Sequence, residues 1–217
     1  MKTFKALESV KTEEGNKVSI IEKSISDLPE GDLLIKVNYS SLNYKDALSA
    51  SGSPGVTRNY PHTPGIDAVG IIEESNNSSF KEGDSVIVTG YDLGMNTAGG
   101  FGQYIRVPSS WAIPLPAGLE EKDSMCLGTA GLTAGLSVFA LDKHNSHQGF
   151  DGTSSIVSGS TGGVGSIALM LLSKLGSNVT AITGKDSQEE LLKNLGASEV
   201  VSREGLSEMT RTPVGKS

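Results

Sequence analysis

The chain has 217 residues with a hydrophobic fraction of 36% and 27 glycines, which suits an α/β or mixed protein of one large or two small domains. Its net charge of −7, without a basic stripe, argues against a nucleic-acid or anionic-membrane partner. No apolar run approaches the roughly 20 residues of a membrane-spanning helix, and the N-terminus lacks a signal-peptide core, so a cytoplasmic protein is expected.

The first half of the chain is rich in short β segments. Turn residues separate the strands expected at 33–39, 68–72 and 86–88, so residues 1–118 are predicted to form a compact β domain. Polar loops lie between these strands and are candidates for ligand contact, because loops carry function more often than strands. For any single residue in them, a turn cap or a solvated side chain explains the sequence equally well. The loops are 43–46, 61–67 and 96–102.

A helical segment rich in small residues joins the two halves. Residues 125–141 predict a pair of helices around Gly128–Gly131, where small side chains let a backbone or a ligand approach closely.

The second half begins with a phosphate-binding pattern. The apolar pair Ile156-Val157 predicts a buried parallel strand, residues 159–165 are rich in glycine, and apolar residues then recur at helical spacing as far as Gly176. Strand, glycine turn and helix stand in the order that a dinucleotide site requires, because the free N–H groups at the helix start attract a pyrophosphate. Ser160 replaces the first glycine of the usual pattern, so a purely structural turn is the alternative.

The elements that follow support the dinucleotide interpretation. A strand is expected at 179–183, then a helix opened by a capping box at Ser187 and Glu190 and closed by Gly196, then the apolar pair Val200-Val201. This order makes one β-α-β-α-β half of a doubly wound parallel sheet. Residues 206–217 read as a disordered tail.

The residue inventory excludes several kinds of chemistry. A single cysteine, Cys126, allows no internal disulfide, and with three scattered histidines it gives no Cys-rich metal site. A short-chain dehydrogenase would need a Tyr-x-x-x-Lys pair after the glycines, whereas all five tyrosines precede them. A kinase-like phosphate loop at the end of the chain lacks its leading glycine, since Thr210 stands there. No bound metal is therefore expected.

The end of the second strand of this half indicates the cofactor. An acidic residue there would bind the ribose hydroxyl of NAD, whereas Thr183, Gly184 and Lys185 offer a hydroxyl, an approachable backbone and a cation to a 2′-phosphate. Arg203, after the third strand, is a second candidate cation, and Asp186 is the one residue that weakens the argument. The expected cofactor is NADP.

Four motifs occur in order along the chain: Ser41–Leu48, Pro64–Asp67, Gly128–Ala134 and Gly159–Gly165. Together they resemble the zinc-independent medium-chain dehydrogenase/reductases, in particular the quinone oxidoreductase and acryloyl-CoA reductase subgroup. The resemblance implies a GroES-like β domain followed by a Rossmann domain. It also implies NADPH-dependent reduction of a carbon–carbon double bond conjugated to a carbonyl.

The resemblance also implies roles for particular residues. Asn43, Tyr44 and Asp67 would face the substrate and the nicotinamide, and Thr129 the nicotinamide ribose. The pyrophosphate would be bound by Ser160, Thr161, Gly162, Gly163 and Val164, and the adenosine phosphate by Thr183, Gly184, Lys185 and Arg203. Gly65-Ile66-Asp67 stands where zinc-dependent relatives have Gly-His-Glu, and Thr129 where they have a cysteine, which agrees with the absence of metal.

Members of this family run further along the Rossmann sheet, so the chain is expected to be C-terminally truncated. The expected domains are a GroES-like substrate domain at 1–118, a partial Rossmann NADP-binding domain with linking helices at 119–205, and the tail at 206–217. A homodimer is expected for the full-length family rather than for this chain. The leading interpretation is an NADPH-dependent reductase of quinones, enones or acryloyl-CoA-like thioesters, and the alternative is an inactive dinucleotide-binding fragment.

Overall fold

The computed structural model describes residues 2–204, so the tail expected at 206–217 lies outside the described residues. The chain forms two compact units, Met1–Thr129 and Ala130–Ser217, here called unit 1 and unit 2. This division falls later than the boundary expected after residue 118. The reason is that Met125 is buried against Val69 and Ile87 and so holds the segment before residue 130 to unit 1.

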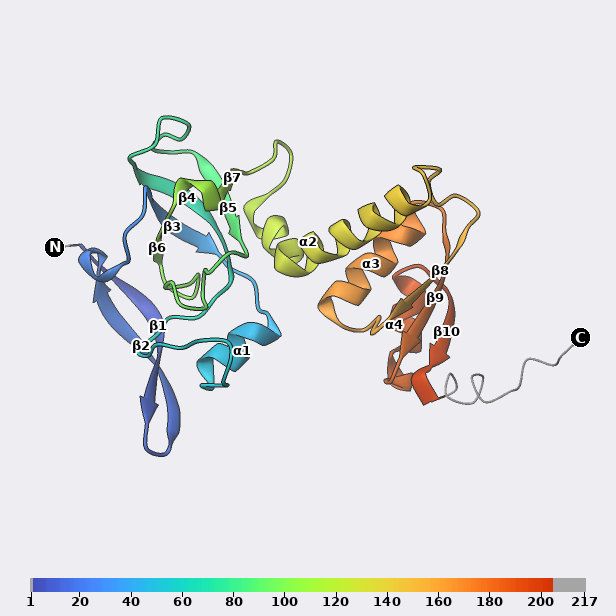
Figure 1. Cartoon of the computed structure of the whole chain (residues 1–217), viewed down its shortest axis with the longest axis horizontal. Coiled ribbons are helices and arrows are strands. Elements are labelled where there is room, and N and C mark those ends of the chain that lie inside the picture. Colours follow the sequence, from blue (N-terminus) through green and yellow to red (C-terminus); the bar gives the residue numbers. More distant parts are fainter. Residues whose placement is uncertain (1, 205–217) are drawn as a thin grey trace, which may run out of the picture. The chain divides into compact units, whose positions relative to one another are not determined.

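Unit 1 is built on a five-stranded antiparallel sheet (Figure 1). Its strands, in spatial order, are β6 (Tyr104–Val107), β3 (Leu33–Tyr39), β4 (Asp67–Ser75), β5 (Ser85–Thr89) and β7 (Ala112–Pro114). The three strands expected from the sequence are β3, β4 and β5, and they are the central ones. Their buried Leu, Ile, Val and Ala side chains pack into one apolar core.

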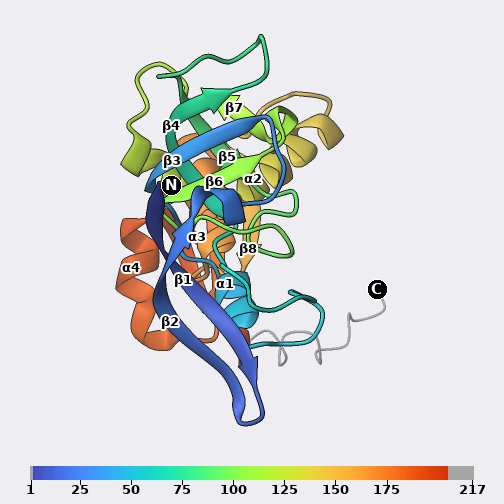
Figure 2. The same ribbon diagram turned by 90° about the vertical axis from the view of Figure 1, so that its left-hand side faces the viewer.

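A hairpin of two long strands, β1 (Thr3–Thr12) and β2 (Gly15–Ser24), forms a separate two-stranded sheet, and Figure 2 shows its turn projecting from unit 1. The backbones of Ser9 and His62 exchange two hydrogen bonds of 2.8 and 2.9 Å, which tie the hairpin to the loop before β4. The short helix α1 (Tyr44–Ala50) follows β3, and single turns of 3-10 helix span Ile25–Asp27 and Ser109–Trp111.

Helix α2 (Glu121–His144) is interrupted at Gly128, whose φ of 49° is not helical. The helix pair expected around this glycine is therefore confirmed. By length and composition alone α2 could span a membrane, with a mean hydropathy of 1.5 over 18 residues, which corrects the expectation that no segment qualifies. The Leu, Val, Phe and Ala residues of α2 raise the mean hydropathy, although Gly, Ser and Thr residues between them interrupt any continuous apolar run. Length and hydropathy are weak evidence for a membrane-spanning helix, since core helices of soluble proteins meet the same two criteria.

Unit 2 contains a three-stranded parallel sheet in the order β10 (Ala197–Ser202), β9 (Asn178–Thr183), β8 (Ser154–Ser158). Helix α3 (Gly163–Lys174) connects β8 to β9, and a 3-10 turn (Asp186–Gln188) with α4 (Glu189–Asn194) connects β9 to β10. The expected β-α-β-α-β half sheet is thus confirmed. The expected capping box is wrong, because α4 begins after Gln188 and no side chain caps it.

The His62 side chain is buried in unit 1 and makes the fold sensitive to acid. Its Nε2–H donates to the Gly94 carbonyl oxygen at 2.9 Å, and 5% of the residue is exposed. Burial lowers the pKa of His62, while the Gly94 hydrogen bond partly opposes that shift. Lys23 also lowers this pKa and Asp92 raises it.

We therefore expect unit 1 to lose stability as the pH falls below about 6.5, the pKa of an unfolded histidine. Below that pH the unfolded chain binds a proton that the folded chain does not, so the free energy of unfolding decreases by at most about 1.4 kcal/mol per pH unit from this group. Urea unfolding of the parent and of His62→Gln at pH 7 and pH 5 measures the effect. The glutamine side chain keeps a hydrogen-bond donor but does not titrate. If the free energy of unfolding of the variant falls between pH 7 and pH 5 by as much as that of the parent, the assignment to His62 is contradicted.

Candidate active site and dinucleotide site

The centre of the candidate active site is the Asp67 carboxylate, at the first residue of β4. It is fully buried. Oδ2 accepts hydrogen bonds from Asn43 Nδ2 at 2.9 Å, from the Thr129 backbone N–H at 3.0 Å and from the Ser41 hydroxyl. Oδ1 accepts from Thr129 Oγ1 at 2.7 Å. Four donors therefore replace the water that this carboxylate gives up on burial.

Gly128 allows this arrangement. Its positive φ turns the chain so that the N–H and the hydroxyl of Thr129 both reach Asp67. A Cβ at residue 128 would lie 2.6 Å from Asp67 Oδ2 and 2.8 Å from Ser41 Oγ, so no other residue fits without moving the carboxylate. The interruption of α2 thus places Thr129 beside Asn43 within unit 1.

A second buried carboxylate, Asp46, fixes the position of Asn43. Asp46 Oδ2 accepts from the Asn43 N–H at 2.8 Å and Oδ1 accepts from the Ile66 N–H at 2.9 Å, so one side chain joins the start of α1 to the start of β4. Burial raises the pKa of Asp46, and the two N–H donors partly oppose that shift. Asp46 was not predicted to be part of the site, although an acid three positions after Asn43 fits the capping-box pattern.

The structure brings Asn43, Asp67 and Thr129 together and leaves Tyr44 in solvent. Tyr44 is the first residue of α1 and is 80% exposed. Asp67 does not present a free carboxylate to a ligand, since its oxygens are occupied by Ser41, Asn43 and Thr129. Its direct effect is therefore on the orientation of Asn43 and Thr129. Within residues 2–204, no three or more His, Cys, Asp or Glu side chains gather where they could hold a metal ion.

The glycine turn of unit 2 leads from β8 into α3. Gly159 has a φ of 63°, and Ser160 is fully buried, with its hydroxyl donating to the Val157 carbonyl at 2.7 Å. The Ser160 N–H donates to the Ile182 carbonyl at 3.2 Å. Ser160 therefore holds the turn closed with both of its polar groups, and its hydroxyl points away from the surface on which a phosphate would lie.

The start of α3 carries the groups suited to an anion. Gly162 is its N-cap and makes no side-chain cap, so the N–H groups of Gly163, Val164 and Gly165 have no acceptor in a preceding helical turn. Gly162, Gly163 and Val164 are exposed, and Thr161 is partly exposed. Such a helix start is a natural phosphate site, because the unpaired N–H groups and the helix dipole both favour negative charge.

The residues expected at the adenosine phosphate also meet in the structure. Thr183 ends β9, and its hydroxyl accepts a hydrogen bond from the Lys185 N–H at 3.0 Å. The Arg203 guanidinium lies against Gly184, so closely that a Cβ on Gly184 would come 2.5 Å from Arg203 Nη2. Thr183 itself is only 3% exposed, whereas Gly184, Lys185 and Arg203 are exposed. An open glycine backbone and two basic residues therefore follow the carboxyl ends of β9 and β10, where doubly wound folds bind ligands.

Comparison with known proteins agrees with this architecture. Residues 29–117 match the family model of the alcohol dehydrogenase GroES-like domain. The chain is 43% identical over 213 residues to YhfP of Bacillus subtilis, which carries the name of a quinone oxidoreductase; the match covers 98% of this chain and 64% of YhfP. It is 40% identical to the acrylyl-CoA reductase AcuI of Ruegeria pomeroyi, over 97% of this chain and 64% of AcuI. The crystal structure of YhfP with NAD bound superposes with a TM-score of 0.92 at 42% identity and covers all of this chain and 65% of that one.

The chain is thus similar along nearly all of its length to proteins named as a quinone oxidoreductase and an acrylyl-CoA reductase, and residues 29–117 match an alcohol dehydrogenase GroES-like domain. The crystal structure of Escherichia coli YhdH with bound NADPH also superposes, with a TM-score of 0.88 at 39% identity, over 97% of this chain and 64% of YhdH. The predicted fold class, a GroES-like β domain followed by an incomplete doubly wound parallel sheet, is confirmed. The chain spans about 64% of the length of these two relatives, YhfP and AcuI.

Proposed function

We propose that unit 2 binds NADPH and that the chain takes part in reducing a carbon–carbon double bond conjugated to a carbonyl, as in a quinone, an enone or an acryloyl thioester. The observation that carries this proposal is the pair of preorganised sites, the glycine turn before α3 and the cluster around Asp67. The names of YhfP and AcuI support the substrate class, because a quinone and an acrylyl thioester share the conjugated carbonyl.

The roles of the residues follow from their hydrogen bonds. In unit 2, the N–H groups at the start of α3 would bind the pyrophosphate, and Arg203 and Lys185 the 2′-phosphate. Bound NADPH supplies a hydride.

In unit 1, one N–H of the Asn43 amide is directed to Asp67, and the other makes only a 3.5 Å contact with Ser41 Oγ. That second N–H is the donor we assign to the substrate carbonyl oxygen. A fixed donor of this kind stabilises the enolate that forms as the double bond is reduced.

This mechanism needs no metal ion. The negative charge that develops on the carbonyl oxygen is met by an amide N–H, and no water has to be activated. Turnover of acrylyl-CoA and of a simple quinone, measured with NADPH in chelator-treated buffer, tests the proposal directly. Activity that appears only when zinc is added would contradict the metal-free mechanism. Tight NADPH binding without turnover of either compound would support the alternative, a cofactor-binding chain that is not itself a reductase.

Arg203 provides the test of cofactor choice, since YhfP was crystallised with NAD and YhdH with NADPH. We expect Arg203→Ala to weaken NADPH binding by roughly tenfold or more, because a charge-assisted hydrogen bond contributes about 1.5–3 kcal/mol. NADH lacks the 2′-phosphate, so its dissociation constant should not change. Fluorescence titration of both cofactors with the parent and the variant measures this difference.

Lys193→Ala is the matched control, since Lys193 is also a cation of unit 2 but pairs with Glu189 on α4. It should leave both titrations unchanged. Equal affinities of the parent chain for NADPH and NADH would overturn the assignment of Arg203 and Lys185 to a phosphate.

A further inference from the structure

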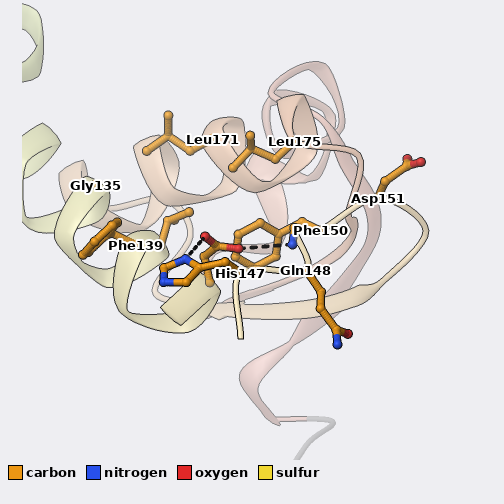
Figure 3. Close-up of a pocket in the computed structure, with 11 residues that line it drawn as sticks. Gly135, Phe139, His147, Gln148, Phe150, Asp151, Leu171 and Leu175 are labelled. Atoms are coloured by element: carbon orange, nitrogen blue, oxygen red, sulfur yellow. Dashed lines mark hydrogen bonds and ion pairs between the residues drawn. The ribbon is translucent and has the colours of Figure 1, made fainter. Parts of the chain in front are cut away.

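Unit 2 has an apolar groove between the C-terminal half of α2, the loop before β8 and the end of α3 (Figure 3). Its volume is about 560 Å³, which lies in the range of small-molecule sites. Large apolar side chains form most of its wall, namely Phe139 of α2, Phe150 of the loop, and Leu171 and Leu175 at the end of α3. Phe150 is buried, whereas Phe139 is 60% exposed, so a molecule in the groove would cover an aromatic ring that now meets solvent.

The groove is separate from the dinucleotide site described above. The glycine turn follows the carboxyl end of β8, whereas Phe150 precedes β8 and so lies toward its amino end. Leu171 lies about 12 Å along the helix axis from Gly163, because an α-helix rises about 1.5 Å per residue. A molecule in the groove would therefore not compete with a pyrophosphate at the start of α3.

One carboxylate holds the loop at the side of the groove. Asp142 Oδ1 accepts from the Gly149 N–H at 3.2 Å, Oδ2 accepts from His147 Nδ1 at 2.9 Å, and the Asp142 carbonyl accepts from the His147 N–H at 2.8 Å. These bonds hold Ser146 and His147 at a φ of 57°, which is uncommon for residues other than glycine. Backbone held in such a conformation is typical of functional sites. The loop thus fixes the His147 ring beside Phe139, with 6.3 Å between the ring centroids.

The polar groups at the groove accept hydrogen bonds rather than donate them. In the neutral imidazole of His147 the proton is on Nδ1, which faces Asp142, so Nε2 is an acceptor. Among the described residues that line the groove there is no lysine or arginine. The side chains of Gln148 and Asp151 extend away from its centre in Figure 3. An anion would therefore find no cation here, whereas a hydroxyl would find an acceptor.

We infer that this groove binds a flat aromatic molecule that carries a hydroxyl group. The ring would lie against Phe139 and the leucines of α3, where burial of apolar surface and contact between aromatic rings both favour binding. The hydroxyl would donate to Nε2 of His147. A carboxylate in its place would offer only acceptors and would lose hydration without gaining a partner.

Equilibrium dialysis of the 217-residue chain at pH 8 against 2-naphthol, naphthalene and 2-naphthoate tests this assignment. We expect 2-naphthol to bind one to one. Naphthalene should bind about fivefold more weakly, because it lacks the hydrogen bond, and 2-naphthoate roughly tenfold more weakly or less tightly still, because its charge is not compensated. Added NADPH should not displace 2-naphthol.

Two variants locate the binding. Leu171→Trp should abolish binding of 2-naphthol, because the larger side chain fills the groove. Leu191→Trp is the matched control, since Leu191 is a similarly exposed leucine that lies on α4 outside the groove. His147→Asn should bring the affinities for 2-naphthol and naphthalene together, because asparagine tolerates a positive φ but lacks Nε2. His144→Asn is its control, since His144 ends α2 outside the groove.

Four results would overturn the inference: no saturable binding of 2-naphthol, its displacement by NADPH, unchanged binding in Leu171→Trp, or an unchanged preference for 2-naphthol over naphthalene in His147→Asn. None of the groove residues belongs to the proposed cofactor site. A chain that fails to bind NADPH or to reduce a quinone would therefore still be expected to bind 2-naphthol.

Discussion

Asp67→Ala is expected to destabilise unit 1 by about 3 kcal/mol or more and to remove any reductase activity. The substitution leaves the partly buried donors of Ser41, Asn43 and Thr129 without their acceptor, and a buried group left unpaired costs about 1–3 kcal/mol. It also frees the Asn43 side chain from the orientation in which we assign it to the substrate carbonyl. Urea unfolding followed by far-ultraviolet circular dichroism measures the first effect, and the assay with acrylyl-CoA or a quinone the second.

Asp67→Asn separates the two consequences, because it keeps the volume and one acceptor while placing an NH₂ group against the donors of Asn43 or Thr129. We expect it to retain more stability than the alanine variant and still to lose orientation of Asn43. Asp32→Asn is the control, since Asp32 is an exposed carboxylate of unit 1 that accepts from the N–H and hydroxyl of Ser109. An Asp67→Ala protein as stable as the parent would show that the cluster is not required by the fold.

The second large effect is expected at Gly165, where valine should weaken NADPH binding while unit 1 stays folded. A Cβ at residue 165 would overlap the Gly159 carbonyl oxygen and come within 3.0 Å of the Ser160 Cα, both of them backbone atoms. The turn would have to open, and overpacking of this kind costs about 1–3 kcal/mol. If that cost falls on binding, the dissociation constant rises by about fivefold to a hundredfold. Fluorescence titration with NADPH measures it.

Gly135→Ala provides a close control in the same unit. Gly135 lies in α2, and nothing stands within 4 Å of a Cβ added there, so alanine should leave binding unchanged and slightly favour the helix. If Gly165→Val binds NADPH as tightly as Gly135→Ala does, the turn before α3 is not the phosphate site.

Local patterns predicted much of this molecule. Short apolar segments separated by turn residues located β3, β4 and β5, and the glycine that ends α4 has the positive φ of 107° that such a residue adopts after a helix. The order of strand, glycine turn and helix predicted the β8–α3 unit, because this pattern depends on residues close together in the chain. The predicted capping box at Ser187 was wrong, because a pattern of four residues does not reveal where neighbouring structure makes the helix begin.

Side-chain direction was less predictable. Ser160 occupies a position typical of a phosphate contact, yet its hydroxyl turns inward to the Val157 carbonyl. Asp46 looked like one polar residue of a loop, but it joins two segments by accepting from Asn43 and Ile66. Neither result can be read from spacing, because each depends on which backbone group the folded chain brings within 3 Å.

Periodicity and turn chemistry were sufficient to predict the two-part architecture and the glycine turn, and the residue types at strand ends led to the assignment of cations to a 2′-phosphate. Only the tertiary structure decided that Asn43, Asp67 and Thr129 meet. They are 24 and 62 residues apart along the chain, and the contact requires the register of β4 and the left-handed turn at Gly128. It also decided that Met125 belongs to unit 1 and that Ile156 lies on an uncovered face. Burial depends on how elements distant in the sequence pack against one another, so it cannot be read from a single segment.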